Sequence, residues 1–410
     1  MRYEVLEHQR IYISSRRDPS RYCISKEDAD HLRVLEEKQG KQIFKWGVNY
    51  LTPQQWIGIV STPDITIEIL PKIAEEQNIN LIKSSFIEML KVTNDIPIRK
   101  NINANTSYGS HGFIDIIAAL FLKELEKQVM RGMIKSYETL TENLNTVKGS
   151  IDFTKQIGKN TVMHHKFYCN YPVLNFNNPL NQLIKYTLTI LKRLTRRQTN
   201  ISLIAKISPY FDLVESKFFT KEDIEKIILN RNSIRFNEVI SYCKIFVSGK
   251  SLELNAGKVN IDFMLFDMNA LFEKFIYKCY KKIYKNVLFQ YTKQKLLSNT
   301  ETGINRLRLK PDIILNLPDN LKIIDTKWKS KGVVEESDIY QMNSYLNTFE
   351  GIHEGVLLYP KSKNNAKMIG DYNFNNQEDL LLVKIRVVDL TELGRNRQAF
   401  FNCLKEIVEG

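Results

Sequence analysis

The chain has 410 residues, a formal net charge of +13, and 43% hydrophobic and 26% charged residues. This length exceeds what one hydrophobic core usually holds, so we expect about two or three domains, and the ordinary composition excludes global disorder. The basic excess indicates a polyanionic partner, most commonly nucleic acid, although a basic surface without such a partner has the same composition. The N-terminal residues lack the apolar segment of a signal peptide, and the most apolar stretch, 113–122, is too short to span a bilayer. We therefore expect a cytoplasmic protein without a membrane partner.

Five cysteines occur, and no two of them are close in the sequence: Cys23, Cys169, Cys243, Cys279 and Cys403. This spacing fits neither a CxxC zinc site nor the disulfide framework of a small secreted domain. We expect buried free thiols in a reducing compartment.

The first part of the chain has the pattern of mixed strands and turns. The stretches 42–48 and 56–73 are rich in β-branched and aromatic residues. In the second stretch Ile65, Ile67 and Ile69 alternate with polar residues, which is typical of a half-buried strand.

The middle of the chain is predicted to be mainly helical. One long helix is expected over 112–140, where apolar residues recur on one face. A second helix, 180–197, follows Asn178 and Pro179, which are both good start signals. Further elements are expected as a short strand at 148–153 and as helices at 221–230 and 233–246.

The last part of the chain mixes helices with strands. In chain order we expect a helix (269–284), two strands (307–315 and 321–327), a helix (336–349), two strands (355–359 and 381–388) and a helix (394–409). This order predicts an α/β layer with a mixed sheet.

The stretch 310–329, KPDIILNLPDNLKIIDTKWK, has the pattern of a β-hairpin with its turn at the central Leu-Pro-Asp-Asn. Asp312 lies in the first strand, while Asp325 and Lys327, two apart in the second, share a face that Thr326 does not. Burying such charges among isoleucines and leucines is costly unless a metal or other partners neutralise them, and hard oxygen ligands favour magnesium or manganese over zinc. The trio therefore indicates metal-assisted phosphodiester hydrolysis, with Lys327 stabilising the attacking hydroxide and the developing charge. The short motif also fits a hairpin with a surface aspartate and an interstrand ion pair, which on the pattern alone is the more frequent case.

Two helices can supply further side chains to this site. Glu273 lies on the inward side of its predicted helix, where a carboxylate can reach a metal site at the sheet. The alternative is a surface glutamate that forms an ion pair one helical turn away. Tyr277, four residues on, carries no charge, which weakens this alternative. Gln341 and Tyr345 are one helical turn apart and could orient Lys327 or contact DNA, although an ordinary amphipathic helix alone is the more frequent explanation.

At these residues the sequence resembles the PD-(D/E)xK nuclease superfamily and, more closely, the McrC family of nuclease subunits of McrBC-type restriction systems. The similar pieces, in the family's order, are ITIEILPKI, NTVKGSIDFTKQI, FYCNYPVLNFNNPLNQLIKYTL, DMNALFEKFI, LKPDIIL with IIDTKWK, and DIYQMNSYL. They extend from about Trp56 to Tyr359, and six pieces in one order are hard to obtain by chance.

This resemblance implies an Mg²⁺-dependent endodeoxyribonuclease in which Mn²⁺ can substitute. The implied site residues are the metal ligands Asp312 and Asp325, the helix carboxylate Glu273, the backbone carbonyl of Thr326 as a further ligand, the catalytic lysine Lys327 and the accessory glutamine Gln341.

The resemblance further implies two partners. One is a ring-forming AAA+ GTPase of the McrB type, which this chain would stimulate. The other is double-stranded DNA that carries a modified base or a specific recognition site. No GxxxxGK[ST] loop occurs in the chain, so nucleotide hydrolysis is expected to belong to the partner. No residue of this sequence can be matched to the family's contacts with the motor.

We therefore expect an α/β (α+β) protein with an adaptor domain of strands and helices at 1–165 that docks on the GTPase. Residues 166–410 would hold a helical connector and a restriction-endonuclease-like domain with a mixed sheet, its core at about 262–410. Two alternatives remain, a non-cutting adaptor that only activates an AAA+ ring and a stand-alone DNA-repair nuclease. The complete set of Asp312, Asp325 and Lys327 argues against the first, and the adaptor-like first half without a motor argues against the second.

Overall fold

The computed structural model describes residues 1–73, 78–94, 96, 112–248, 254–256, 259–298, 300, 305–317, 320–329, 334–362, 366–374 and 381–409. The chain forms two compact units, Met1–Ile117 with Gly249–Gly410 (unit 1) and Ala118–Ser248 (unit 2). A boundary between the adaptor domain and the rest of the chain is expected from the sequence after residue 165, and this functional boundary stays a prediction. The two compact units are divided at other residues. In the described part of the chain, no helix combines the length and the apolarity needed to cross a bilayer.

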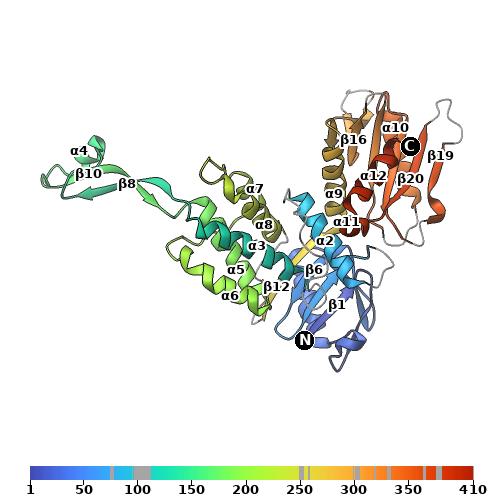
Figure 1. The fold of residues 1–410 in the computed structure, drawn as a ribbon, viewed down its shortest axis with the longest axis horizontal. Helices are drawn as coiled ribbons and strands as arrows, with labels where there is room; N and C mark the ends of the chain where they lie inside the picture. The colour runs from blue at the N-terminus through green and yellow to red at the C-terminus, as the bar shows by residue number, and fades with distance from the viewer. Residues whose placement is uncertain are drawn as a thin grey trace. The chain divides into compact units, whose positions relative to one another are not determined.

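Two sheets build the N-terminal part of unit 1 (Figure 1). The first has the strand order β1 (Arg2–Leu6), β7 (Thr66–Leu70), β6 (Trp56–Ser61), β12 (Val259–Asp267) and β11 (Leu254–Ala256). The second has the order β3 (Cys23–Ser25), β2 (Ile11–Ser14), β5 (Tyr50–Pro53) and β4 (Phe44–Trp46), and is accompanied by helix α1 (Lys26–Gln39). Strand β12 runs directly into helix α9 (Met268–Ile283), so the first sheet fixes the start of the helix that carries Glu273.

The strand expected around Ile67 is confirmed as β7, but it is buried on both faces rather than on one. The side chain of Glu68 is as inaccessible as that of Ile67. Its carboxylate accepts a hydrogen bond from Arg2 at 2.5 Å and lies 3.6 Å from the ammonium group of Lys83 on α2 (Ile79–Thr93). A buried carboxylate is tolerated when cations pair with it in this way, because the pairing offsets its desolvation.

The single long helix expected over 112–140 is wrong. Helix α3 (Phe113–Met130) ends near Gly132, whose φ of +107° is readily adopted by glycine alone. The chain then continues as strand β8 (Ser136–Leu144).

Unit 2 combines a helical bundle with an antiparallel arm. The bundle contains α5 (Pro179–Leu194), α6 (Gln198–Ile207), α7 (Lys221–Glu225) and α8 (Asn237–Ser248). The expected start of α5 is confirmed, because the side chain of Asn178 accepts a hydrogen bond from the backbone N–H of Asn181. The helices expected at 221–230 and 233–246 are present but shorter or shifted.

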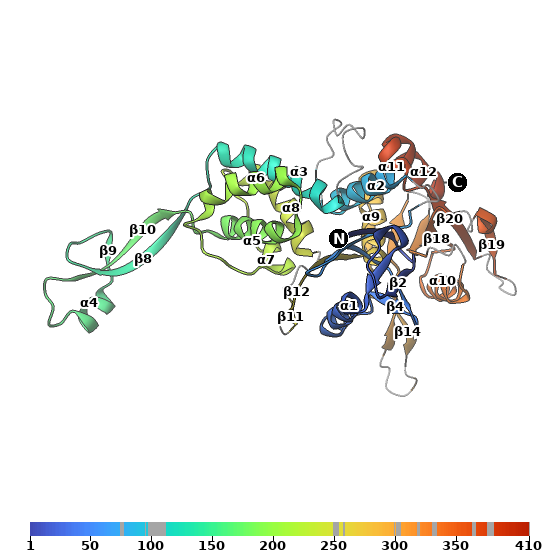
Figure 2. The same ribbon diagram turned by 90° about the horizontal axis from the view of Figure 1, so that it is seen from below.

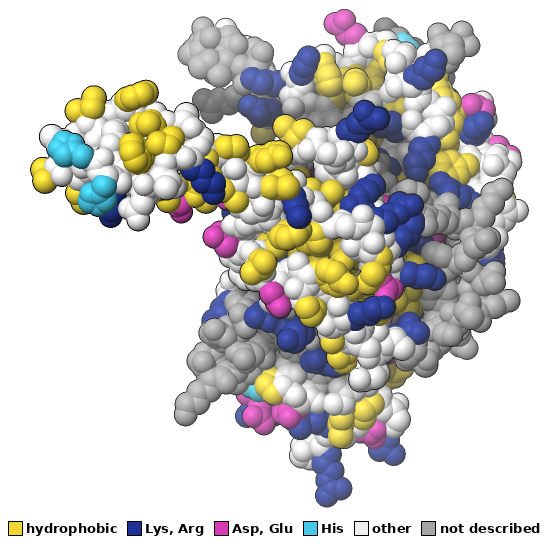
Figure 3. Space-filling view, turned by 60° about the vertical axis from the view of Figure 1, so that its left-hand side comes forward, with side chains coloured by type: hydrophobic (Ala, Val, Ile, Leu, Met, Phe, Trp, Pro, Cys, Tyr) yellow, Lys and Arg dark blue, Asp and Glu magenta, His cyan; other side chains and the backbone are white. Residues whose placement is uncertain are grey.

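The arm consists of β8, β10 (Phe167–Asn175), β9 (Ser150–Ile151) and the short helix α4 (Phe153–Lys159). Within unit 2 it runs outward from the helices (Figure 2), and its end carries hydrophobic side chains at the surface (Figure 3). Phe153 and Ile157 are 70% and 72% exposed.

The C-terminal part of unit 1 is built on the expected mixed sheet. The strand order is β13 (Val287–Phe289), β16 (Ile313–Asn316), β17 (Leu321–Thr326), β18 (Glu354–Pro360), β20 (Leu382–Val388) and β19 (Gly370–Asn373). Strands β17, β18 and β20 are parallel and the other pairs are antiparallel. The expected strand at 307–315 is wrong in extent, because the chain leaves one strand before Pro311 and enters β16 only after it.

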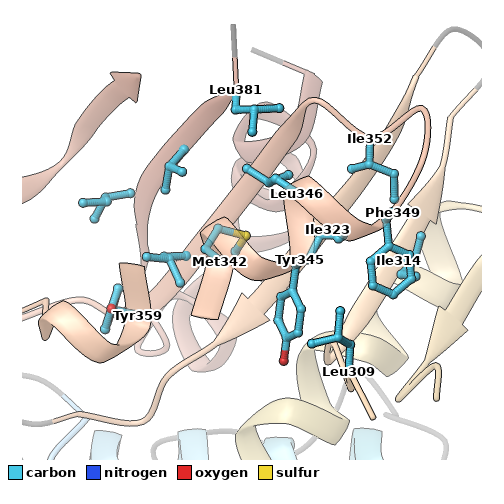
Figure 4. Close-up of a cluster of buried hydrophobic side chains, with 13 residues drawn as sticks. Leu309, Ile314, Ile323, Met342, Tyr345, Leu346, Phe349, Ile352, Tyr359 and Leu381 are labelled. Carbon is cyan, nitrogen blue, oxygen red and sulfur yellow. The ribbon is translucent and has the colours of Figure 1, made fainter. Parts of the chain in front are cut away.

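Helix α10 (Glu336–Thr348) covers one face of this sheet, and α12 (Arg397–Glu409) covers the other. Met342, Tyr345 and Leu346 of α10 pack with Ile323 of β17 in one buried cluster (Figure 4). On the opposite face the ammonium group of Lys322 donates to the backbone carbonyl of Val408 at 2.7 Å.

The expectation of buried free thiols is confirmed for three of the five cysteines, whereas Cys23 and Cys403 are only half-buried. All five are free, and Cys169, Cys243 and Cys279 are buried.

Gly58 offers a test of the N-terminal sheet. Its φ is +153°, and a Cβ atom there would lie 1.9 Å from the backbone carbonyl oxygen of Met264 on the neighbouring strand. We expect Gly58→Ala to lower the free energy of unfolding by about 1–3 kcal/mol, because a backbone atom must move to admit the methyl group. Denaturant unfolding checks this, with Gly158→Ala as the control, because Gly158 has open space around it. An unchanged stability of Gly58→Ala would contradict the close approach of the two strands.

Candidate active site

The hairpin predicted at 310–329 is present and brings the two aspartates together. Strands β16 and β17 pair antiparallel with Ile313 opposite Ile324, and the backbone N–H of Leu317 donates to the carbonyl of Asn320 at 3.0 Å. One step further in the same register sets Asp312 opposite Asp325. Two residues of the expected turn, 318 and 319, lie outside the described residues.

Asp312 is held by the end of the neighbouring strand. Its Oδ2 accepts hydrogen bonds from the backbone N–H and the hydroxyl of Thr326, at 2.7 and 2.8 Å. Burial raises the pKa of Asp312 above its ordinary value, and the two bonds from Thr326 act in the opposite direction.

Asp325 is the most buried carboxylate of the site, with 1% of its surface exposed. Burial, followed by repulsion from Asp312, raises its pKa to about 7. The ammonium group of Lys327 lies 2.5 Å from Oδ2, although this oxygen accepts no hydrogen bond of good geometry. The expectation that Asp325 and Lys327 share a face therefore agrees with the contact between their side chains.

Glu273 reaches the same place from helix α9. Its Oε1 accepts a hydrogen bond from the side-chain amide of Gln290 at 2.7 Å. Burial and then repulsion from Asp312 raise the pKa of Glu273 to about 7. Three carboxylates from a helix and two strand ends thus act on one another in a poorly solvated site.

Lys327 is fixed by a relay of hydrogen bonds from helix α10. Its ammonium group donates to Oε1 of Gln341 at 2.7 Å, and the amide of Gln341 donates to the hydroxyl of Tyr345 at 2.7 Å. The hydroxyl of Tyr345 donates in turn to the backbone carbonyl of Lys310 at 3.0 Å. The structure therefore brings Gln341 and Tyr345 to the predicted lysine, while the catalytic roles of all these residues stay predictions.

A second group of side chains at the site was not found from the sequence. Asp338 binds Lys329 at 2.7 Å and accepts a hydrogen bond from the hydroxyl of Tyr359 at 2.9 Å. It also lies 4.0 Å from the ammonium group of Lys327. Its place in the same helical segment as Gln341, three residues earlier, was a signal that could have identified it.

Trp328 connects the lysine segment to the N-terminus of the chain. Its indole N–H donates to both carboxylate oxygens of Glu7, at 3.1 and 3.0 Å, and its ring packs edge-on against Phe272 of α9. Trp328 and Glu7 are both buried. No pattern in the sequence relates Glu7 to a residue more than 300 positions away.

The fit of these residues to a divalent cation can be judged from their chemistry. Among the described residues, no three His, Cys, Asp or Glu side chains are spaced to hold a metal as they stand. Protein donors from Thr326, Lys327 and Gln290 contact the carboxylates instead. Asp312 nevertheless contributes to the raised pKa of both Asp325 and Glu273, and such repulsion between poorly solvated carboxylates is what a hard divalent cation neutralises. The donor set is all oxygen. The residues therefore fit such a cation if the carboxylate oxygens that now contact these protein donors also coordinate the ion.

The bond between Trp328 and Glu7 can be tested by a double-mutant cycle. Trp328→Phe leaves a buried carboxylate without its donor, so we expect it to lower the free energy of unfolding by about 1–3 kcal/mol. The double variant Trp328→Phe with Glu7→Leu should recover part of this loss, because neither polar group then remains. Denaturant unfolding measures both, with the exposed Tyr340→Phe as the control. Strictly additive losses would show that the two side chains do not interact.

Comparison with known proteins identifies the family. The model of a family described as "McrBC 5-methylcytosine restriction system component" matches residues 51–360. The chain is 26% identical over 270 residues to the type IV methyl-directed restriction enzyme EcoKMcrBC of Escherichia coli (strain K12), a match that covers 61% of this chain and 77% of that protein.

Solved structures share the fold. A half-complex of Thermococcus gammatolerans McrB AAA+ hexamers with bound McrC matches with a TM-score of 0.68 and 16% identity, covering 100% of both chains. The T. gammatolerans McrBC complex matches with a TM-score of 0.53 and 18% identity, covering 69% of this chain and 88% of the other. The expected resemblance is confirmed, and this chain belongs to the McrC family of McrBC 5-methylcytosine restriction system components.

Proposed function

We propose that this chain is the Mg²⁺-dependent endodeoxyribonuclease subunit of a restriction system, with a PD-(D/E)xK active site. The observation that carries the proposal is the meeting of Asp312, Asp325, Glu273 and Lys327 at the end of β17. Ion pairs that serve stability alone also shift pKa values, but one buried and two half-buried carboxylates with raised pKa values beside a lysine are what a metal-dependent nuclease needs.

The three carboxylates would hold Mg²⁺, or Mn²⁺ in its place, and the backbone carbonyl of Thr326 would be a further ligand. When bound, the ion supplies Lewis-acid polarisation of the phosphate and lowers the pKa of a water molecule. The hydrogen bonds from Thr326 and Gln290 orient the oxygens of Asp312 and Glu273 for this task.

Lys327 would act as a fixed positive charge. Burial alone would lower its pKa, but Asp325, followed by Asp338 and Asp312, raises it above the ordinary value. The group therefore stays protonated at neutral pH and is suited to stabilise an attacking hydroxide and the developing phosphoryl charge rather than to accept a proton. Gln341 holds its Nζ atom in place without adding a charge.

The partner in this proposal is a ring-forming AAA+ GTPase of the McrB type. The support is the solved relative, which contains McrB AAA+ hexamers with bound McrC. This chain has no GxxxxGK[ST] sequence, so we assign nucleotide hydrolysis to the ring and its stimulation to this chain.

The proposed substrate is double-stranded DNA. The family description names 5-methylcytosine, so duplexes that carry this base are the first substrates to test.

Asp325→Asn tests the cutting activity. With the ring partner, GTP and Mg²⁺, we expect it to reduce DNA cleavage at least about 100-fold, because it removes a charge that the site needs. Stimulation of the partner's GTPase should be unchanged, and the exposed Glu336→Gln on α10 should cleave like the wild type. Normal cleavage by Asp325→Asn would refute this active site. A wild type that stimulates GTPase but never cuts would favour the non-cutting adaptor.

Metal binding can be followed without measuring activity. We expect Mg²⁺ and Mn²⁺ to raise the melting temperature of the wild type, because a ligand that binds only the folded state stabilises it. Asp312→Asn should weaken this response, since one ligand charge is removed, whereas Asp371→Asn on the exposed strand β19 should retain it. A wild type that responds to neither ion would contradict the metal site.

A further inference from the structure

A short β-ribbon rises directly from the candidate active site. Strands β14 (Lys295–Ser298) and β15 (Asn305–Arg308) pair antiparallel in a two-stranded sheet of their own. Figure 2 shows them extending away from the six-stranded sheet of unit 1. The ribbon lies in the chain between the edge strand β13 and β16, the first strand of the β16–β17 hairpin.

The residues that lead into the ribbon and out of it at its base belong to the site. On the outgoing side, Gln290 binds Glu273 through its side chain, and its backbone N–H donates to the carbonyl of Asp312 at 2.8 Å. On the returning side, the carbonyl of Lys310 accepts the hydroxyl of Tyr345. The ribbon therefore starts and ends beside the carboxylates.

The base of the ribbon is anchored in the hydrophobic core. The ring of Tyr291 lies 6.0 Å from that of Phe349. Leu309 belongs to the same buried cluster as Tyr345, and Figure 4 shows the two side chains next to each other. The backbone N–H of Leu309 also donates to the carbonyl of Gln294 at 3.1 Å. These contacts fix the direction in which the ribbon leaves the site.

The ribbon is strongly basic. Residues 291–298 and 305–310 contain five Lys or Arg and no Asp or Glu. Among them, Lys293, Lys295, Arg308 and Lys310 have exposed side chains. Lys293 lies two residues before Lys295, the first residue of β14, and Arg308 stands directly opposite Lys295. Lys310, whose backbone carbonyl accepts the hydroxyl of Tyr345, extends the basic row to the edge of the site.

The shape and the remaining side chains fit a nucleic-acid groove. A two-stranded ribbon is narrow enough for the major groove of B-form DNA. Leu297 and Leu307 are 52% and 62% exposed, so the ribbon also offers apolar contacts beside its cations. An isolated ribbon gains little stability by itself, which makes a binding role a better explanation than a structural one.

We propose that the β14–β15 ribbon binds the duplex next to the cut, with Lys293, Lys295 and Arg308 on backbone phosphates, and so delivers the scissile bond to Asp312 and Asp325. This inference rests on the nuclease activity proposed above and adds the surface that receives the DNA.

The test uses the full chain, a fluorescein-labelled DNA duplex and no divalent metal, so that binding is measured apart from cleavage. The ribbon variant carries Lys293→Gln, Lys295→Gln and Arg308→Gln. We expect at least about a tenfold loss of affinity at moderate salt, and a salt dependence whose slope falls by about 0.9 for each phosphate that is no longer neutralised. Its stimulation of the partner's GTPase should equal that of the wild type.

The control variant carries Lys281→Gln, Lys285→Gln and Lys405→Gln. These exposed lysines, at the end of α9 remote from Glu273 and on α12, give the same change of net charge. A ribbon variant whose affinity and slope equal those of the control overturns the proposal, even if the wild type cuts DNA. If the ribbon variant loses DNA binding, the control does not, and the wild type never cleaves DNA, the result supports the DNA-binding surface and contradicts the nuclease activity.

Discussion

The burial of like charges at the end of β17 is the constraint on which the rest of unit 1 depends. Asp325 has 1% of its surface exposed and faces Asp312 across the hairpin, and Glu273 approaches from α9. Such a group is unstable unless cations and donors surround it, because the desolvation of each carboxylate costs several kcal/mol or more by order-of-magnitude estimates. Thr326 and Lys327 at the end of β17 and Gln290 just after β13 supply that compensation. The sheet, α9 and α10 can therefore be understood as the frame that holds these segments at contact distance.

The parts of the structure that sequence could predict are those set by local periodicity. The side-chain contact of Asp325 with Lys327 followed from the two-residue repeat of a strand, and the start of α5 followed from Asn178 and Pro179. Where two signals competed, the prediction failed. The helical pattern after residue 112 was extended through Gly132, although glycine and the Thr-rich segment beyond it favour the strand that forms there.

Other features could not be predicted because they arise only when distant segments pack. The bond between Trp328 and Glu7, the hydrogen bond from Gln290 to Glu273, and the burial of Glu68 beside Arg2 have no signature in local spacing. The extent of a strand also depends on such packing. Pro311 was visible in the sequence, but the pairing of the residues before it in a separate ribbon depends on the preceding strand, β14.

Unit 2 interrupts unit 1 in the sequence, and this has a consequence for synthesis on the ribosome. Strand β6 pairs with β7 on one side and with β12 on the other, and β12 is translated only after all of Ala118–Ser248. Domains generally fold as they emerge, so the nascent chain holds an open edge at β6 while the inserted module completes its own fold. A transcript truncated before β12 would yield a product with that edge exposed and without any of the residues proposed to act in catalysis, so chaperones or proteases would be expected to remove it.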